Sequence, residues 1–229
     1  MKFVTYTNIN GETPRFGFKR DTEIVDVIRS GIWVNENIKD SSFLTVPTTL
    51  KLALGNWDIN FSKLKNLNQA IPDTDLSSLE VDEKPIAIKE SEASLLPPVT
   101  NPDTFRDFYA FEQHVKAARK LRGLEMHPDW YKLPIFYFSN PTTLYGHGEI
   151  VPYPTGTEEL DFELEFAIII ANGGQNIKKE NADKMIAGYT ILNDWSARDL
   201  QREEMQLNLG PAKGKDFANS FGPYMVTPD

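Results

Sequence analysis

Acidic residues two positions apart mark the stretch 160–170, which reads Leu-Asp-Phe-Glu-Leu-Glu-Phe-Ala-Ile-Ile-Ile. Side chains two positions apart on a β-strand share a face. Asp161, Glu163 and Glu165 are therefore predicted to lie on one face, which turns apolar beyond Glu165. A strand face in solvent stays polar along its length, so this change predicts that Glu163 and Glu165 lie at the rim of a buried face.

Two neighbouring carboxylates in a partly buried site repel each other. At least one of Glu163 and Glu165 should then be protonated, unless a cation lies between them. A hard divalent cation is the simplest solution, because Mg²⁺, Ca²⁺ and Mn²⁺ prefer oxygen ligands. The alternative is an ordinary half-exposed strand with a solvated acidic stripe, and this strand alone does not decide between the two.

A second chemically rich stretch, Asn-Asp-Trp-Ser-Ala-Arg-Asp-Leu-Gln, follows an apolar segment that predicts a strand over 188–193. This strand should end at Asp194. Ser196 is a suitable cap for a helix over 197–205, on which Arg198 and Gln201 are three residues apart and face the same way. A loop with Gly-Pro follows the helix and leads to Lys215.

A third candidate pair lies on the segment 103–123, where aromatic and apolar residues recur at helical spacing and Gly123 is a suitable stop. Asp107 and His114 are seven residues apart, close to two helical turns, and are predicted to share a face. By themselves they are more simply explained as a surface acid and an edge residue of an amphipathic helix.

The elements that must position these residues form an α+β, mainly β, chain. Residues 1–70 predict a small β-rich N-terminal domain, 71–100 a connecting segment, and 101–229 the domain that carries the chemistry. Residues 1–35 as a whole are expected to be β. The expected strands are 2–7, 15–19, 23–27, 86–88 and 133–138, with a turn at Asn10-Gly11 and helices at 47–54 and 61–68.

The composition limits the classes of function. With 229 residues, 40% of them hydrophobic, the chain can build one core or a core plus a small appendage. The net charge is −9 without a long basic run, so neither nucleic acid nor a membrane is expected as a partner. The chain has no cysteine, which excludes disulfides, thiolate metal sites and a cysteine nucleophile. We expect a cytoplasmic protein without a signal peptide.

Five motifs, taken together, resemble the fumarylacetoacetate hydrolase family over about residues 103–227. They are Asp107-Phe108-Tyr109 leading to His114; Asp161-Phe162-Glu163-Leu164-Glu165; Asn193 through Gln201; Gly210-Pro211 with Gly214-Lys215; and Gly222-Pro223. The resemblance implies a mixed β-sandwich roll of that family after the N-terminal domain. Because family members continue for many more strands, it also implies that the chain is truncated at its C-terminus.

The resemblance also implies roles for single residues. Asp107, Glu163, Glu165 and Asp194 would be the metal ligands, for Mg²⁺ or Ca²⁺ with Mn²⁺ also compatible. His114 would be the general base, with Lys215 and Arg198 as the catalytic cations. Further substrate contacts would come from Tyr109, Arg122, Tyr137 and Gln201.

The implied reaction is hydrolysis of a carbon–carbon bond in a β-diketone acid, such as fumarylacetoacetate or an acylpyruvate. The metal would hold both oxygens and accept the charge of the enolate, while His114 activates water and Lys215 and Arg198 stabilise negative charge. One alternative is a decarboxylase, hydratase or isomerase of the same family that acts on a 2-oxo acid. Another is a non-catalytic remnant. The expected partners are a small dicarbonyl acid and a second copy of the chain in a homodimer.

Two positions depart from the family pattern. A glutamate that orients the base histidine is expected beyond the end of this sequence, and Glu112, though close to His114, should point elsewhere on its helix. Asn219 occupies the position where fumarylacetoacetate hydrolases of the closest branch carry a hydroxyl residue.

Overall fold

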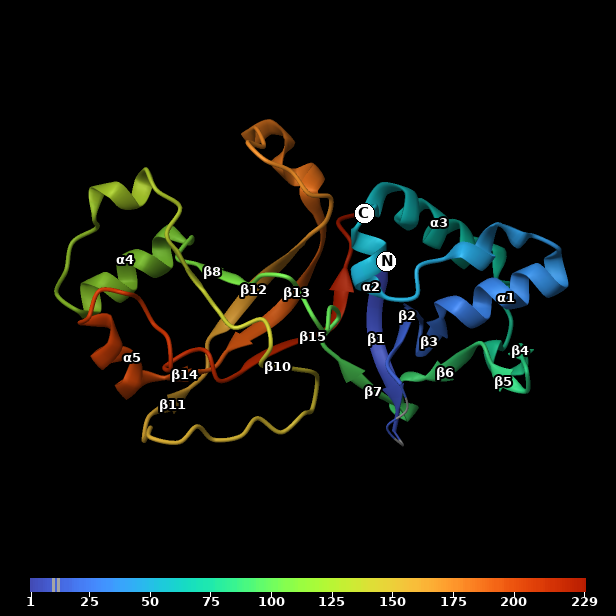
Figure 1. Ribbon diagram of the computed structural model, residues 1–229, viewed down its shortest axis with the longest axis horizontal. Coiled ribbons are helices and arrows are strands. Elements are labelled where there is room, and N and C mark those ends of the chain that lie inside the picture. Colours follow the sequence, from blue (N-terminus) through green and yellow to red (C-terminus); the bar gives the residue numbers. More distant parts are fainter. Residues whose placement is uncertain (10, 12) are drawn as a thin grey trace.

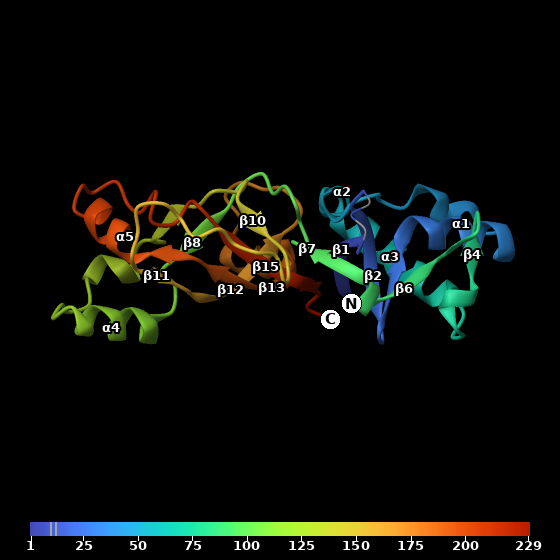
Figure 2. The ribbon, with the colours of Figure 1, turned by 90° about the horizontal axis from the view of Figure 1, so that it is seen from below.

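The computed structural model describes residues 1–9, 11 and 13–229, and two lobes lie side by side along its long axis (Figures 1 and 2). The N-terminal lobe contains the strands β1 (Lys2–Asn8), β2 (Arg15–Arg20), β3 (Glu23–Asp26), β4 (Glu80–Val81), β5 (Lys84–Pro85), β6 (Ala87–Lys89) and β7 (Ala93–Leu96). Its helices are α1 (Val27–Ile38), α2 (Leu50–Leu54) and α3 (Trp57–Ala70).

The second lobe carries the candidate site. Its strands are β8 (Arg106–Phe108), β9 (Phe136–Phe138), β10 (Leu144–Tyr145), β11 (Leu160–Asp161), β12 (Leu164–Ile170), β13 (Ile186–Asp194), β14 (Ser196–Ala197) and β15 (Asn219–Val226). Its helices are α4 (Glu112–Leu121) and α5 (Arg198–Met205). None of the helices in the described part of the chain is long and apolar enough to cross a bilayer.

One large sheet, nine-stranded within the described residues, runs through both lobes. Its order is β12-β13-β15-β1-β2-β3-β6, with β7 also paired to β1 and β10 also paired to β15. All these pairs are antiparallel except β10 with β15. Because β1 lies beside β15, the first and last strands of the chain join the two lobes.

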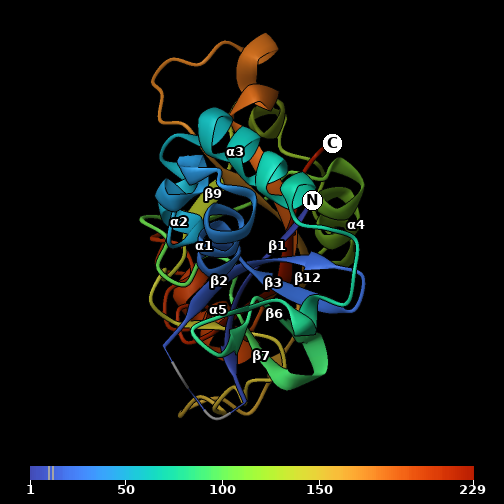
Figure 3. The same cartoon turned by 90° about the vertical axis from the view of Figure 1, so that its right-hand side faces the viewer.

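The N-terminal core lies between the sheet and its helices (Figure 3). Apolar side chains of β1 and β2, such as Phe3 and Phe18, pack with Val34 of α1 and Leu64 of α3. All four are fully buried. The side chains that alternate with them in β1 point to the opposite face and form a smaller cluster around Tyr6 with Leu95 of β7.

The expected N-terminal strands and helices are confirmed, but the assignment of all of 1–35 to β is wrong. Residues 27–35 lie in α1, because the side chain of Asp26 caps this helix by accepting a hydrogen bond from the backbone N–H of Arg29 (2.8 Å). Of the predicted Asn10-Gly11 turn, Asn10 lies outside the described residues. The segment 71–100 contributes β6 and β7 to the main sheet, while the domain boundaries themselves stay a prediction.

The predicted helix over 103–123 begins later than expected, at Glu112. Asp107 instead lies on β8, which forms a hairpin with β9, and Phe105 packs edge-on against Phe221 (5.2 Å between ring centroids). These tertiary contacts outweigh the helical spacing of the aromatic residues. The prediction that Asp107 and His114 share a helical face is therefore wrong.

The predicted strand over 160–170 is interrupted between β11 and β12. At the interruption, the backbone N–H of Glu163 donates to the side chain of Asn193 (3.1 Å). Beyond it, residues 165, 167 and 169 on the acidic face of β12 are half-buried rather than buried, and the opposite face is open. Leu164, Phe166 and Ile170 on that open face are 58–74% exposed, at an edge of the main sheet.

Asp26 is the buried polar centre of the N-terminal lobe, because its carboxylate also accepts hydrogen bonds from Tyr6 and Arg15. We expect Asp26→Ala to lower the free energy of unfolding by about 3 kcal/mol or more, since it leaves these donors without an acceptor. Urea denaturation measures the change. Glu36→Ala, an exposed change in the same helix, is the control and should stay within about 0.5 kcal/mol. Equal effects of the two substitutions would contradict this role of Asp26.

Candidate functional site

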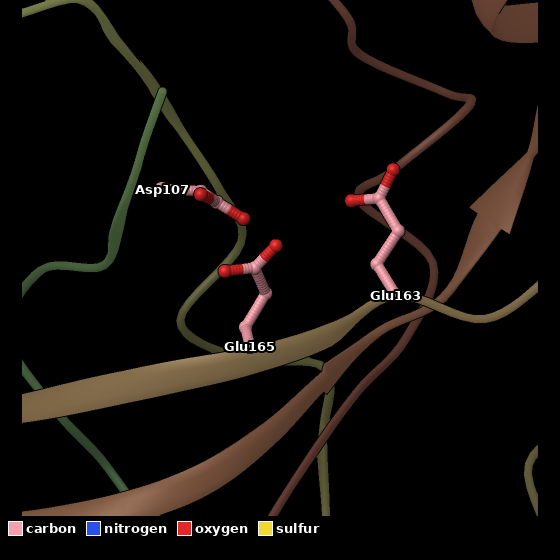
Figure 4. A group of neighbouring side chains, drawn as sticks. All are labelled: Asp107, Glu163 and Glu165. Atoms are coloured by element: carbon pink, nitrogen blue, oxygen red, sulfur yellow. The ribbon is translucent and has the colours of Figure 1, made fainter. Parts of the chain in front are cut away.

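Three carboxylates from separate parts of the chain converge in the second lobe. Asp107 comes from β8, Glu165 from β12, and Glu163 from the interruption before β12. One oxygen of each lies within 4.8 Å of the others, and the three side chains point toward a common space (Figure 4). This spacing allows a single ion to contact all three.

A fourth acid, Asp194 at the end of β13, is connected to this group through Tyr137 and Lys215 and is fully buried. Its Oδ2 atom accepts hydrogen bonds from Lys215 (2.9 Å) and from the hydroxyl of Tyr137, which also lies 3.4 Å from Asp107 Oδ2. Its Oδ1 atom has no hydrogen-bond partner among the described residues. Such a buried acceptor is costly unless a further group contacts it.

Two basic side chains balance part of this negative charge. Lys215 Nζ bridges Glu163 (2.5 Å) and Asp194 (2.9 Å), and the Lys215 side chain is only 3% exposed. Arg198 pairs with the other oxygen of Glu163 (2.6 Å) and with the more exposed Asp161 (2.9 Å). Both cations are thus held by acids of the site.

Burial and neighbouring charges shift the pKa values of three of these acids in different directions. Burial, together with Asp194 and Glu165, raises the pKa of Asp107 to about 8. Burial and the neighbouring Glu163 and Asp194 raise the pKa of Glu165. Burial acts in the same direction on Glu163, but Lys215 and Arg198 outweigh it and lower its pKa.

The donor set fits a hard divalent cation. Carboxylate oxygens are the ligands that Mg²⁺, Ca²⁺ and Mn²⁺ prefer, and three lie within reach of one point. Asp194 also has a buried Oδ1 atom without a hydrogen-bond partner among the described residues, which a bound cation could contact. The residues of this chain could therefore hold the ion that the acidic motifs predict.

The other predicted residues surround the same space. A cavity of about 1740 Å³ is lined by every predicted site residue except the buried Asp194, and these are Asp107, Tyr109, His114, Arg122, Tyr137, Glu163, Glu165, Arg198, Gln201 and Lys215. The structure thus brings all eleven into one region, although their functional roles stay predictions. Glu112 contacts Tyr131 (2.7 Å) and Lys116 (2.6 Å), so it is engaged away from His114 as expected.

Tyr137 lies differently from a simple substrate contact. Its hydroxyl points to Asp194 and Asp107, which are predicted metal ligands.

Arg122 contacts Tyr109 (3.2 Å) and the backbone carbonyl of Ala118 (3.1 Å), which are both neutral. The Arg122 guanidinium is therefore better placed than Arg198 to receive a negatively charged group.

Helix α5 positions several of these groups. Near its start, the Asp199 carboxylate accepts hydrogen bonds from Thr157 and from the backbone N–H of Glu158 (2.8 Å). Arg202 forms two hydrogen bonds with Glu159 (2.7 and 2.8 Å). The helix is thereby fixed to the segment that leads into β11, and Arg198 in its first turn reaches Asp161 and Glu163.

Two contacts of the site were not predicted from the sequence. Asp161 was expected on the acidic face, but its pairing with Arg198 was not. Glu204 contacts the loop before Lys215. It lies three residues after Gln201, so the helical spacing that placed Arg198 and Gln201 on one face could have revealed it as well.

Comparison with known proteins identifies the family. A family model described as "Fumarylacetoacetate (FAA) hydrolase C-terminal" matches residues 103–229, more than half of the chain. The chain belongs to the fumarylacetoacetate hydrolase family. Fumarylacetoacetase of Oryza sativa subsp. japonica is 31% identical over 204 residues, which cover 79% of this chain and 47% of that protein. This confirms the family predicted from the motifs.

Relatives within the family carry different activities in their names. Oxaloacetate tautomerase YisK of Bacillus subtilis (strain 168) is 40% identical over 94 residues, which cover 41% of this chain and 31% of that protein. The chain spans about half the length, or less, of these curated relatives. Family membership therefore indicates an enzyme of this superfamily without separating hydrolase from isomerase.

Solved structures support the fold of the fumarylacetoacetate hydrolase family, a mixed α/β fold with a large antiparallel sheet. The hydrolase from psychrophilic Exiguobacterium antarcticum has a TM-score of 0.59 at 22% identity, covering 99% of this chain and 66% of that one. A 2-hydroxyhepta-2,4-diene-1,7-dioate isomerase from Mycobacterium marinum has a TM-score of 0.56 at 17% identity, with coverage of 100% and 67%.

Metal binding to this site should release protons. With a pKa of about 8, Asp107 is mostly protonated at pH 7 in the metal-free protein, and it must ionise to bind a cation. The affinity for Mn²⁺ should therefore rise with pH, by up to about tenfold per unit below pH 8, and level off above it. Calorimetric titration in buffers of different ionisation enthalpy measures both quantities.

Asp107→Asn is the matched variant for this experiment. It keeps the shape of the side chain but removes the titrating group, so the proton release assigned to Asp107 should disappear. An affinity of the unchanged chain that is constant from pH 6 to 8 would contradict the assignment.

Proposed function

We propose that this chain is a metal-dependent hydrolase that cleaves a carbon–carbon bond in a β-diketone acid, such as fumarylacetoacetate or an acylpyruvate. The proposal is carried by one observation: four carboxylates from distant parts of the chain meet beside only two cations, one of which, Arg198, also pairs with Asp161. With these acids ionised, the site has an excess of negative charge that a divalent cation would reduce.

Asp107, Glu163, Glu165 and Asp194 are proposed to hold this cation. When bound, Mg²⁺ or Ca²⁺ would supply positive charge to both oxygens of a dicarbonyl and favour the enolate as leaving group. The geometric support comes from the three clustered carboxylates and from the buried, unpartnered Oδ1 atom of Asp194.

The remaining roles follow from what each side chain contacts. His114 lines the cavity and is proposed to take a proton from the water that attacks the carbonyl carbon. Lys215 Nζ is proposed to stabilise the oxyanion that forms. Arg122, whose partners among the described residues are neutral, is proposed to bind the carboxylate of the substrate. Arg198 would chiefly hold Glu163 in place.

A second candidate is an isomerase, decarboxylase or hydratase that acts on a 2-oxo acid. It is favoured by the 40% identity to a protein named as an oxaloacetate tautomerase, the highest identity among the relatives compared above. Proton transfer to and from carbon needs the same enolate stabilisation but no attacking water.

The expected β-sandwich roll and the expected homodimer also remain proposals. Light scattering tests the homodimer.

Removal of one proposed metal ligand should strongly reduce either activity. We expect Glu165→Gln to lower kcat by about 10²-fold or more, because the site loses a charged ligand. The measurement compares acetylpyruvate and fumarylacetoacetate hydrolysis with oxaloacetate tautomerisation, each with Mg²⁺ and with a chelator. Glu180→Gln, a change at an exposed position, is the control. Full activity of Glu165→Gln, or of the chelated protein, would contradict the proposal.

The two candidate reactions differ in their dependence on activated water. If the chain is a hydrolase, His114→Asn should lower kcat for carbon–carbon cleavage by about 10²–10⁴-fold while leaving Mn²⁺ affinity nearly unchanged. Tautomerisation of oxaloacetate without any cleavage of the diketone acids would instead establish the second candidate.

A further inference from the structure

The segment between α5 and Lys215 determines where the Lys215 ammonium lies. Lys215 reaches Glu163 and Asp194 from the end of the loop 210–215, and its side chain is almost completely buried. A long lysine side chain has many rotamers, so a fixed position requires a fixed backbone below it. The loop itself is not part of a helix or strand.

Glu204 on α5 holds this loop by its backbone. Its Oε2 atom accepts hydrogen bonds from the N–H groups of Ala212 (2.9 Å) and Gly214 (3.0 Å), and its Oε1 atom accepts from that of Lys213 (2.6 Å). Three successive amides thus converge on one carboxylate immediately before Lys215. Hydrogen bonds to an ionised acceptor are among the stronger ones in proteins.

The electrostatics of Glu204 agree with this geometry. Partial burial opposes ionisation of the carboxyl group, but the three amides outweigh this effect and lower its pKa. The ionised group offers two oxygens with free lone pairs, which suits an arrangement of three donors around it.

Gly214 brings the loop against α5 as well. A Cβ atom at this position would lie 2.8 Å from the backbone nitrogen of Gln201, so only glycine fits without displacement. The carbonyl of Gly214 also accepts a hydrogen bond from the backbone N–H of Ala197 (2.8 Å). The loop therefore packs along the same helix that carries Arg198 and Gln201.

We propose that Glu204 is a positioning residue, which fixes the loop 210–215 so that Lys215 Nζ stays between Glu163 and Asp194. This deepens the proposed function and rests on it, because Lys215 is the group assigned there to the oxyanion. Among the described residues, the Glu204 carboxylate forms hydrogen bonds only with the loop, and Glu204 does not line the cavity. It acts through the backbone of the loop, and its removal releases Lys215.

Amine labelling tests this role without any assay of activity. In the unchanged chain, a water-soluble amine reagent should modify Lys215 slowly and Lys132 rapidly, because their side chains are 3% and 69% exposed. Peptide mass mapping follows both lysines in the same sample. Lys132 lies outside the loop 210–215 and is thus an internal reference for the reagent.

Three variants distinguish the loss of the Glu204 carboxylate from a general effect of substitution in α5. Glu204→Ala removes all acceptors and should raise the labelling rate of Lys215 at least about tenfold, which corresponds to about 1.4 kcal/mol of loop stability. Alanine is a strong helix former, so α5 should persist, and circular dichroism checks this. Glu204→Gln keeps one oxygen and should give an intermediate rate. Glu203→Gln, the exposed neighbour, should label like the unchanged chain.

The outcome distinguishes this inference from the proposed function. Unchanged labelling of Lys215 in Glu204→Ala would overturn the inference, as would equal acceleration in Glu203→Gln. If Glu204→Ala accelerates the labelling of Lys215 but the unchanged chain shows no turnover, the inference is supported and the proposed function is contradicted. If turnover is present, Glu204→Ala should lower kcat more than it changes KM, with partial rescue by Glu204→Gln.

Discussion

Repulsion between buried carboxylates is the constraint on which the second lobe depends. Asp107, Glu163, Glu165 and Asp194 come from elements as much as 87 residues apart, yet their oxygens share one small region. A fold can hold such a group only when positive charge is supplied nearby. Lys215 and Arg198 provide part of it, while burial and the neighbouring acids still raise the pKa values of Asp107 and Glu165.

The surrounding elements hold the acids and the basic side chains of the site at fixed positions relative to each other. Helix α5 is attached on one side, through Asp199 and Arg202, to the segment before β11. On the other side it is attached, through Glu204, to the loop before Lys215. Both attachments use carboxylates or guanidinium groups with two or more hydrogen bonds, which are more rigid than single contacts. One short helix thereby sets the distance between the two cations.

Residue types and local spacing predicted much of the site, because its motifs are short and each lies within one segment. The pairing of Glu163 with Glu165 and of Arg198 with Gln201 follows from the periods of a strand and a helix. The position of Asp107 does not, because the β8–β9 hairpin is set by contacts with residues far along the chain. Helix α1 is a different case, because its cap, Asp26, directly precedes it and is a local signal that the sequence already contains.

The pairing of β1 with β15 has a consequence for how the protein is made. Lys2 lies opposite Val226, so the first residues of β1 gain their partner only after β15 has been synthesised, whereas residues 5–8 pair with β7 much earlier. Contacts between such distant parts of a chain slow folding and leave a strand edge accessible during synthesis. The N-terminal lobe can form its helices and its own core early, but the edge at which the two lobes meet is completed only once residues 219–226 have been synthesised.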